Sequence, residues 1–297
     1  MSAGRVRGGF NQYGFTVGIL MLDTRFPRIP GDMGNAQTFP FPVRYHRVPG
    51  ADPERVVRGG AEGLLERFVE GARLLEREGV GAITTNCGFL VRFQRELAGA
   101  VRVPVFTSSL LLVPLVYALL PPGQRVGILT VDARALTPAH LAGAGIGSDL
   151  PIAVAGLETE KEFTRVLLGD ELELDVEAAR EEHVRVARRL LAEHPDVGAI
   201  VLECPNMPPY AADIQAGAFY PPHWVLPLFV RAGRLLPESY EALEILHAAL
   251  GGLLMGLLAR RLFGGRAARI FAGVGFAFSS FFVVRMKHGN IVEAVAW

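Results

Sequence analysis

The sequence predicts an α/β protein made of two pseudosymmetric, doubly wound parallel-sheet domains with the functional site between them. Short apolar runs alternate with segments of helical spacing, which is typical of βαβ units. The pattern Val-Gly-Ala-Ile-x-x-x-Cys occurs twice, at Val80–Cys87 and Val197–Cys204. A second pair of similar segments is formed by Val17–Asp23 and Val126–Asp132, and one of them lies upstream of each copy. The repeat indicates a duplicated domain, and the only two cysteines of the chain occupy the same position in it.

In the first half, residues 1–121, the run Val17–Leu22 is continuously apolar, as expected for a strand buried on both faces. The Pro- and Gly-rich segment 24–53 is longer than a usual connection, which favours a functional loop. Pro53, with Asp52 as N-cap, predicts the start of a helix that runs to about Glu78. The other expected elements are an edge strand at 41–48, strands at 80–84 and 103–106, and helices at 90–98 and 110–120.

The second half, residues 122–222, repeats this order of elements. Its expected strands are 125–130, 152–154 and 199–202, and its expected helices are 138–142, 175–193 and 209–216. In open α/β sheets, ligands bind beyond the carboxyl ends of the strands. Cys87 and Cys204 each lie just past such an end, so two facing halves would bring both sulfurs to one cleft.

The last part of the chain, residues 223–297, departs from the repeat and predicts an atypical apolar helical tail. Uncharged stretches at 245–259 and 270–284 flank a link rich in arginine. A membrane hairpin through 245–284 is one interpretation, although each stretch is shorter than the ~20 residues that span a bilayer. Helices packed on the globular body are the second, and a fused or shifted reading frame is the third.

Composition narrows the function classes. Lys+Arg and Asp+Glu both number 30, so no net charge attracts the protein to nucleic acid. The segment Gly143–Gly147 lacks the spacing of a dinucleotide loop, and the seven histidines show no metal-ligand spacing. We therefore expect neither cofactor nor metal. The apolar run 15–22 has no small-residue cleavage site, so we expect a cytoplasmic protein; a homo-oligomer stays an open alternative.

Two thiols beside one carbon could form a two-base system for proton transfer next to a carboxylate. A thiol titrates near pH 8.5, so either one can serve as acid or base after modest tuning. A cysteine taken alone is more often a small buried hydrophobe. The charge that builds on the carboxylate needs hydrogen-bond donors. Donor candidates at the strand ends are Thr84, Thr85, Asn86, Ser108, Ser109 and the amides of Gly88 and Phe89, although Ser and Thr there are also ordinary helix caps.

The segments Pro30–Asn35, Thr84–Phe89, Thr107–Ser109 and Glu203–Met207 resemble the aspartate/glutamate racemase superfamily over about residues 17–218. That group includes cofactor-independent amino-acid racemases, hydantoin racemases, maleate isomerases and arylmalonate decarboxylases. The resemblance implies two pseudosymmetric α/β domains with Cys87 and Cys204 as the catalytic pair. It also implies carboxylate binding by the residues that follow each cysteine, which include Asn206.

The chain departs from the superfamily pattern at three places. Gly88-Phe89 stands where many amino-acid racemases have Asn-Thr, which leaves the substrate open. Pro205 stands where Thr is expected, and proline offers no N–H to an oxyanion. The closing strand and helix expected after Ala218 are replaced by the apolar tail.

Three hypotheses follow. The first is a cofactor-independent racemase or epimerase of a carbon next to a carboxylate, in an amino acid or hydantoin. Cys87 and Cys204 act as acid and base, and Asp23 and Asn35 line the cleft, although Asp23 alone is typical of a turn. The second is a one-cysteine isomerase or decarboxylase of a small dicarboxylate. The third is a non-catalytic or membrane-tethered member of the superfamily.

Overall fold

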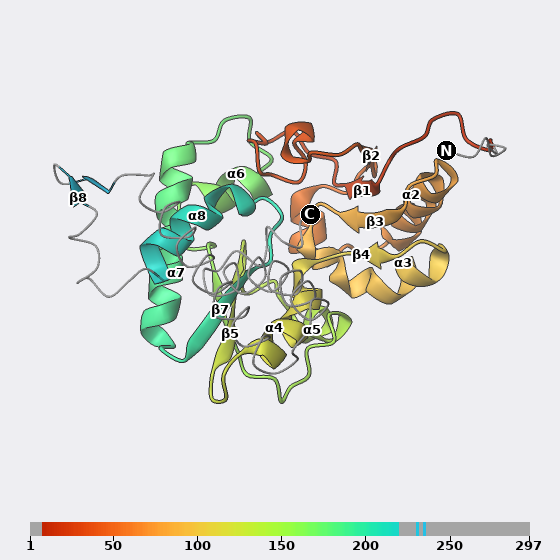
Figure 1. Ribbon diagram of the computed structural model, residues 1–297. Helices are drawn as coiled ribbons and strands as arrows, with labels where there is room; N and C mark the ends of the chain where they lie inside the picture. Colours follow the sequence, from red (N-terminus) through yellow and green to blue (C-terminus); the bar gives the residue numbers. More distant parts are fainter. Residues whose placement is uncertain (1–7, 220–229, 232–233, 236–297) are drawn as a thin grey trace, which may run out of the picture. The chain divides into compact units, whose positions relative to one another are not determined.

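The computed structural model describes residues 8–219, 230–231 and 234–235 (Figure 1). The chain divides into two compact units. The first extends to Tyr210 and contains both parallel sheets, and the second begins at Ala211. All residues discussed below as parts of the site belong to the first unit.

The first sheet has four parallel strands in the order β2-β1-β3-β4. They are β1 (Val17–Met21), β2 (Val43–Arg47), β3 (Ala82–Thr85) and β4 (Val105–Phe106). The edge strand expected within 41–48 is confirmed as β2. Ile19 and Leu20 of the central strand β1 are fully buried, as expected for a strand covered on both faces.

The second sheet has the order β6-β5-β7 and repeats the first. Its strands are β5 (Arg125–Thr130), β6 (Ile152–Gly156) and β7 (Val197–Leu202). In the first sheet Val17 is paired with Ala82, and in the second Val126 is paired with Ala199, which is the equivalent residue of the repeat. The duplicated sequence therefore folds with a duplicated register, and the predicted two-sheet α/β class is confirmed.

The helix predicted from Pro53 to Glu78 is wrong in one respect, because two helices occupy that segment. They are α1 (Pro53–Val57) and α2 (Leu65–Arg77). Gly60, Ala61 and Gly63 between them have φ angles of 62°, 55° and 68°, and such left-handed residues end a helix. The predicted cap is confirmed, since the Asp52 carboxylate accepts a hydrogen bond from the Arg55 amide at 2.9 Å.

The two helices expected after β3 and β4 begin as 3-10 turns. Gly88–Phe93 winds as a 3-10 segment before α3 (Gln94–Ala100), and Ser109–Leu112 does so before α4 (Val113–Leu119). The prediction of continuous α-helices over 90–98 and 110–120 was therefore wrong in the first turn of each. Such tighter turns are frequent at helix N-termini, and here they place backbone amides directly behind Cys87.

The second half contains α5 (Pro138–Gly143), α6 (Phe163–Leu168) and α7 (Val176–Glu193). The helix α6 was not predicted, because it is short and has no proline at its start, unlike α5, which begins at Pro138. Its start is fixed from outside: the buried carboxylate of Glu182 in α7 accepts hydrogen bonds from the amides of Lys161, Glu162 and Phe163, at 2.8–2.9 Å. Shorter 3-10 turns lie at Ala36–Thr38 and Pro208–Tyr210.

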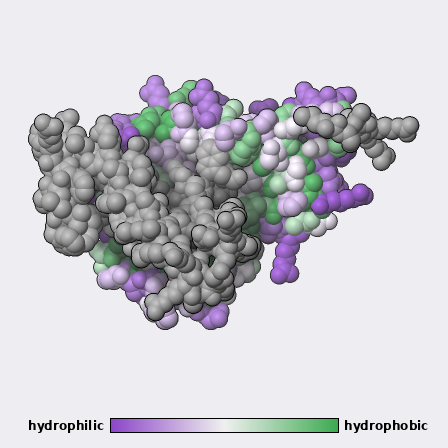
Figure 2. Space-filling view, viewed as in Figure 1, coloured by the Kyte–Doolittle hydropathy of each residue, from purple (hydrophilic) through white to green (hydrophobic). Residues whose placement is uncertain are grey.

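The unit that begins at Ala211 has few described elements. They are α8 (Ala211–Ile214), a π-helical turn at Gln215–Phe219, and the antiparallel pair β8 (Val230–Arg231) and β9 (Arg234–Leu235). Within the described ranges, no helix has both the length and the apolar character needed to cross a bilayer. The helices and the membrane hairpin predicted within 245–284 lie outside the described residues. On the face drawn in Figure 2, hydrophilic and hydrophobic residues are interspersed where the surface is coloured.

Candidate functional site

Cys87 and Cys204 line the same small pocket in the first unit. Each lies just beyond the carboxyl end of a strand, β3 and β7 respectively, and each is 7% exposed. The pocket has a volume of about 30 Å³, which is room for roughly two water molecules. Its described lining comprises Leu22, Phe26, Pro53, Val57, Asn86, Cys87, Gly88, Phe89, Val131, Leu167, Leu168, Glu203, Cys204 and Asn206.

The Cys87 side chain sits at the N-cap of the 3-10 turn Gly88–Phe93. Burial raises the pKa of its thiol to about 12, and the charge of Glu203 acts in the same direction. Backbone amides of Phe89 and Leu90 donate to the sulfur and oppose this rise in pKa. Hydrogen bonds to the charged form favour it, so these two amides partly offset the effect of burial, which remains the larger.

The Cys204 thiol has a different surrounding. Burial raises its pKa well above the ordinary value, and the charges of Glu203, Cys87 and Asp32 add to that rise, against one amide hydrogen bond from Asn206. The thiol itself donates to Asn206 Oδ1 at 3.4 Å. Since a thiol can donate and a thiolate cannot, this contact favours the protonated form of Cys204.

A buried carboxyl group, Glu203, lies with the two cysteines in the pocket lining. It is 1% exposed, and burial raises its pKa to about 8, against the hydrogen bond that Thr130 Oγ1 donates to Oε2 at 2.8 Å. The other oxygen, Oε1, is buried without a hydrogen-bond partner in the described part of the chain. Gly88 makes room for it, because a Cβ at that position would collide with Oε1.

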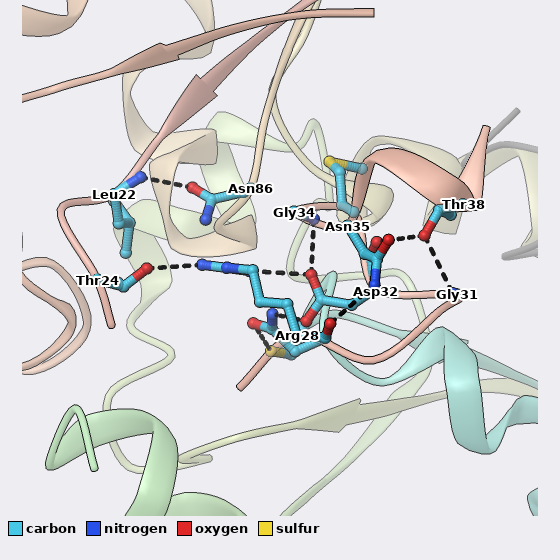
Figure 3. A network of polar contacts seen from close by, with 12 residues as sticks. Leu22, Thr24, Arg28, Gly31, Asp32, Gly34, Asn35, Thr38 and Asn86 are labelled. Atoms are coloured by element: carbon cyan, nitrogen blue, oxygen red, sulfur yellow. Dashed lines mark hydrogen bonds and ion pairs between the residues drawn. The ribbon is translucent and has the colours of Figure 1, made fainter. Parts of the chain in front are cut away.

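The long loop after β1 is ordered by a buried ion pair. Arg28 Nη1 lies 2.9 Å from Asp32 Oδ1, with side chains 12% and 4% exposed, and Arg28 Nη2 donates to Thr24 Oγ1 at 2.9 Å. Figure 3 shows Arg28 extended between Thr24 and Asp32, with the amide of Gly34 donating to the same Asp32 oxygen at 2.6 Å. Asp32 Oδ2 accepts from the Asn206 side-chain amide. The loop therefore holds the residue that contacts the Cys204 thiol.

Four of the predicted substrate-binding residues lie with the cysteines in the pocket lining: Asn86, Gly88, Phe89 and Asn206. The Asn86 Oδ1 accepts from the Leu22 amide at 2.7 Å, which leaves its NH₂ end for another partner (Figure 3). Phe89 packs edge-on against the buried ring of His140 in α5, with ring centroids 5.2 Å apart. This contact anchors the turn that follows Cys87 to the second half.

The remaining predicted residues do not line the pocket, and their contacts with substrate stay predictions. Asp23 is paired with Arg47 and accepts from the Gly50 amide. Asn35 caps the turn Ala36–Thr38 and donates to Arg28 O. The Thr85 hydroxyl lies 2.9 Å from Cys87 O, Ser108 caps the turn at Ser109–Leu112, and Ser109 donates to Leu202 O at 2.6 Å. These last three support the two cysteine loops.

The sequence reasoning did not assign roles to Glu203, Thr130, Arg28 or Asp32. A signal was present for Glu203, because an acidic residue directly after the apolar run Val197–Leu202 enters the sheet's carboxyl edge with no turn to carry it to solvent. Asp32 lies in a segment that carries the superfamily resemblance. Nothing in the sequence indicated that Arg28 is its partner.

No protein-family model matches the chain. Among curated proteins, it is 32% identical over 212 residues to dimethylsulfoniopropionate lyase of Durusdinium sp. clade D, and the match spans 69% of this chain and 70% of that protein. The chain belongs to the dimethylsulfoniopropionate lyase family. Dimethylsulfoniopropionate lyases 6 and 7 of Emiliania huxleyi are further members, each 28% identical over 215 residues. The chain covers 56% and 62% of their lengths, less than two thirds of either.

Solved structures similar to this member of the family include a variant of arylmalonate decarboxylase with associated sulfate, at 17% identity and a TM-score of 0.44. That match covers 67% of this chain and 84% of the decarboxylase. Aspartate racemase of Picrophilus torridus matches at 16% identity and a TM-score of 0.42, over 66% and 83% of the two chains.

Proposed function

We propose that this chain is a cysteine-dependent lyase that cleaves dimethylsulfoniopropionate into dimethyl sulfide and acrylate. One observation carries the proposal: two cysteines at equivalent strand ends line one pocket, in a chain of the dimethylsulfoniopropionate lyase family. The substrate named by its relatives has a carboxylate at one end and a sulfonium group on the second carbon from it. The sequence predicted that the two cysteines transfer a proton next to a carboxylate, and the cleavage of this substrate begins with the removal of such a proton.

The reaction balances without a cofactor. A thiolate takes a proton from the carbon next to the carboxylate, and the electron pair of that C–H bond forms a carbon–carbon double bond. The bond from the second carbon to the sulfonium sulfur breaks, and its electrons leave with dimethyl sulfide. Acrylate remains, and the proton now on the thiol passes to solvent.

Cys87 is the base in this scheme. The amides of Phe89 and Leu90 favour its thiolate, whereas the contact with Asn206 favours the protonated form of Cys204. Burial alone would keep Cys87 protonated, since it raises the pKa to about 12. The positive sulfonium of a bound substrate lowers that pKa, because an opposite charge a few ångströms away favours the ionised form. The sulfonium of a bound substrate therefore favours the thiolate, provided that donors in the pocket offset the charge of the substrate carboxylate.

The pocket walls suit the apolar part of this substrate. Leu22, Phe26, Val57, Leu167 and Leu168 surround the space beside the two sulfurs. Apolar walls accommodate the methyl groups of the sulfonium and exclude water, which strengthens the electrostatic interactions inside the site. Asn86 and Gly88 also line the pocket, and their N–H groups are donors that can bind a carboxylate.

A second candidate is the two-base racemase predicted from the sequence. It is favoured by the presence of both thiols in one lining, since a one-base elimination needs only one of them. Both candidates begin with proton removal next to a carboxylate. They differ in the next event, which is loss of a leaving group in the lyase and return of a proton by the second thiol in the racemase. The lyase is closer to the one-cysteine alternative.

The test is to incubate the full chain in D₂O with dimethylsulfoniopropionate, and separately with single-enantiomer amino acids and hydantoins, and to follow the products by NMR. A lyase forms acrylate and dimethyl sulfide, whereas a racemase forms α-deuterated substrate of both configurations. The Cys87→Ser/Cys204→Ser double variant is the matched control. The proposal is wrong if the wild type releases no more acrylate than this control.

A further inference from the structure

The mechanism above assigns no role to Glu203, although it is the ionisable side chain of the described pocket lining besides the cysteines. Its carboxyl group is 1% exposed and lies against Gly88, which precedes the amides that support the Cys87 sulfur. A buried polar group without a partner is destabilising. No described protein group satisfies Oε1, so a ligand that does so would gain that interaction.

The proton on Glu203 has a defined place. Oε2 already accepts the hydroxyl of Thr130 at 2.8 Å, so the acid proton of the neutral form belongs on Oε1. Burial raises the pKa of Glu203 to about 8, which keeps the group mostly protonated at pH 7. A neutral carboxyl then presents one O–H donor that has no acceptor in the described protein.

The pocket needs such a donor. Among the described residues that line it, none is Lys, Arg or His. Arg28 lies nearby, but its guanidinium is paired with Asp32 and bonded to Thr24. A substrate carboxylate must therefore be bound by neutral donors. An O–H donated to a carboxylate is among the stronger hydrogen bonds in proteins, and it strengthens further as charge accumulates on the acceptor oxygens during proton removal.

We propose that Glu203 acts as a neutral carboxylic acid that binds the substrate carboxylate by donating a hydrogen bond from Oε1. The inference rests on the proposed function, because it requires a substrate with a carboxylate in this pocket. The titratable groups that face Glu203 are the thiols of Cys87 and Cys204, with the Asp32–Arg28 pair next to Asn206. Ionisation of Glu203 places a negative charge against the ligand, so binding of a carboxylate weakens as the pH rises.

The probe is propionate, which has the carboxylate but no leaving group and so reports binding without turnover. Its dissociation constant is measured by NMR titration of the full chain between pH 7 and pH 9. For a single protonated donor with a pKa of about 8, wild-type binding weakens about tenfold over this range. Glu203→Gln keeps a neutral donor, and its dissociation constant stays within about threefold across the range. Glu203→Leu removes the donor and weakens binding at least about tenfold at pH 7.

Glu78→Gln is the matched control, because Glu78 is a carboxylate paired with Arg44 and does not line the pocket. It retains the tenfold pH dependence of the wild type. The proposal is overturned if wild-type protein does not bind propionate at pH 7, if its binding is flat with pH, or if Glu203→Gln keeps the wild-type slope. If Glu203→Leu does not fold, the slope of Glu203→Gln still decides.

The experiment also separates this inference from the proposed function. A chain that cleaves dimethylsulfoniopropionate but binds propionate with no dependence on Glu203 is a lyase with a different carboxylate donor. If the chain binds propionate with the predicted dependence on pH and on Glu203 but releases no acrylate, Glu203 is still the carboxylate donor. In that case the assignment of dimethylsulfoniopropionate as the substrate is wrong.

Discussion

Replacement of Glu203 by Gln should remove a loss of stability that the wild type suffers as the pH rises from 6.5 to 8. Glu203 has an ordinary pKa of 4.5, and its pKa in the folded protein is about 8. Between these values the unfolded chain has released the proton and the folded chain has kept it. The free energy of unfolding therefore falls by about 1.4 kcal/mol per pH unit as the pH rises.

The comparison with Glu203→Gln over the range from pH 6.5 to 8 isolates this residue. Burial lowers the pKa of His140 and of His183 to about 4, so stability rises as the unfolded histidines lose their protons near pH 6.5, and this opposing contribution is the same in every variant. The cysteines have raised pKa values, and they contribute only once the unfolded thiols ionise near pH 8.5. Within the range, the Glu203 term integrates to about 1.6 kcal/mol.

The assay is urea unfolding followed by circular dichroism at pH 6.5, 7, 7.5 and 8 for the wild type, Glu203→Gln and Glu78→Gln. Over this range the wild type and Glu78→Gln should each lose about 1.6 kcal/mol more than Glu203→Gln, because the histidine and thiol contributions are common to all three proteins. The contribution of Glu78 to the free energy of unfolding does not change over this range. Its hydrogen bond and ion pair with Arg44 lower its pKa, so that contribution varies only below pH 4.5. Equal slopes for the wild type and Glu203→Gln would refute the assignment of a buried neutral carboxyl.

Three further predictions concern the same site. Iodoacetamide should alkylate Cys87 and Cys204 at least about tenfold more slowly than free cysteine at pH 7, because burial raises the pKa of both thiols. The rate, measured by mass spectrometry, should increase as the pH rises. Fast alkylation at pH 7 would contradict buried neutral thiols. Gly88→Ala should lower the free energy of unfolding by about 1–3 kcal/mol because its Cβ collides with a buried carboxyl, whereas Gly99→Ala, with open space around it, should not lower it. Asp32→Asn should cost about 3–5 kcal/mol in the same urea assay, since it leaves a buried guanidinium without a counter-charge, and a loss under 1 kcal/mol would show that the ion pair is not buried.

Much of the fold was accessible from the sequence because its strongest signals are local. The repeated Val-Gly segments predicted β1 and β5, and the copies that end in cysteine predicted β3 and β7, all within a few residues of the observed bounds. Apolar runs bounded by polar residues leave few alternatives for a buried parallel strand.

The errors came from features that local pattern does not encode. The break between α1 and α2 depends on residues with a left-handed conformation, such as Gly60 and Gly63. Apolar residues on both sides keep helical spacing, so the pattern predicts one continuous helix. The helix α6 exists because Glu182, about twenty residues later, satisfies its first amides. A capping partner so distant in sequence leaves no local signal.

The cysteines of the site were predicted because the duplication placed them at equivalent strand ends. Glu203 belongs to the motif Glu203–Met207, and only its position directly after a buried strand indicates that its charge enters a buried edge. The Arg28–Asp32 pair could not be inferred, since it depends on how a long loop folds back on itself. The sequence thus predicted which two thiols share a pocket, and the structure added the buried groups around them that affect their protonation.

The most direct test of the account is the rate of acrylate release from dimethylsulfoniopropionate by Cys87→Ser compared with Cys204→Ser, with the fold of each variant checked by circular dichroism. The account predicts a loss of at least about hundredfold for Cys87→Ser, the size expected when a general base is removed, and a smaller loss for Cys204→Ser. Wild-type rates in the Cys87 variant would contradict it.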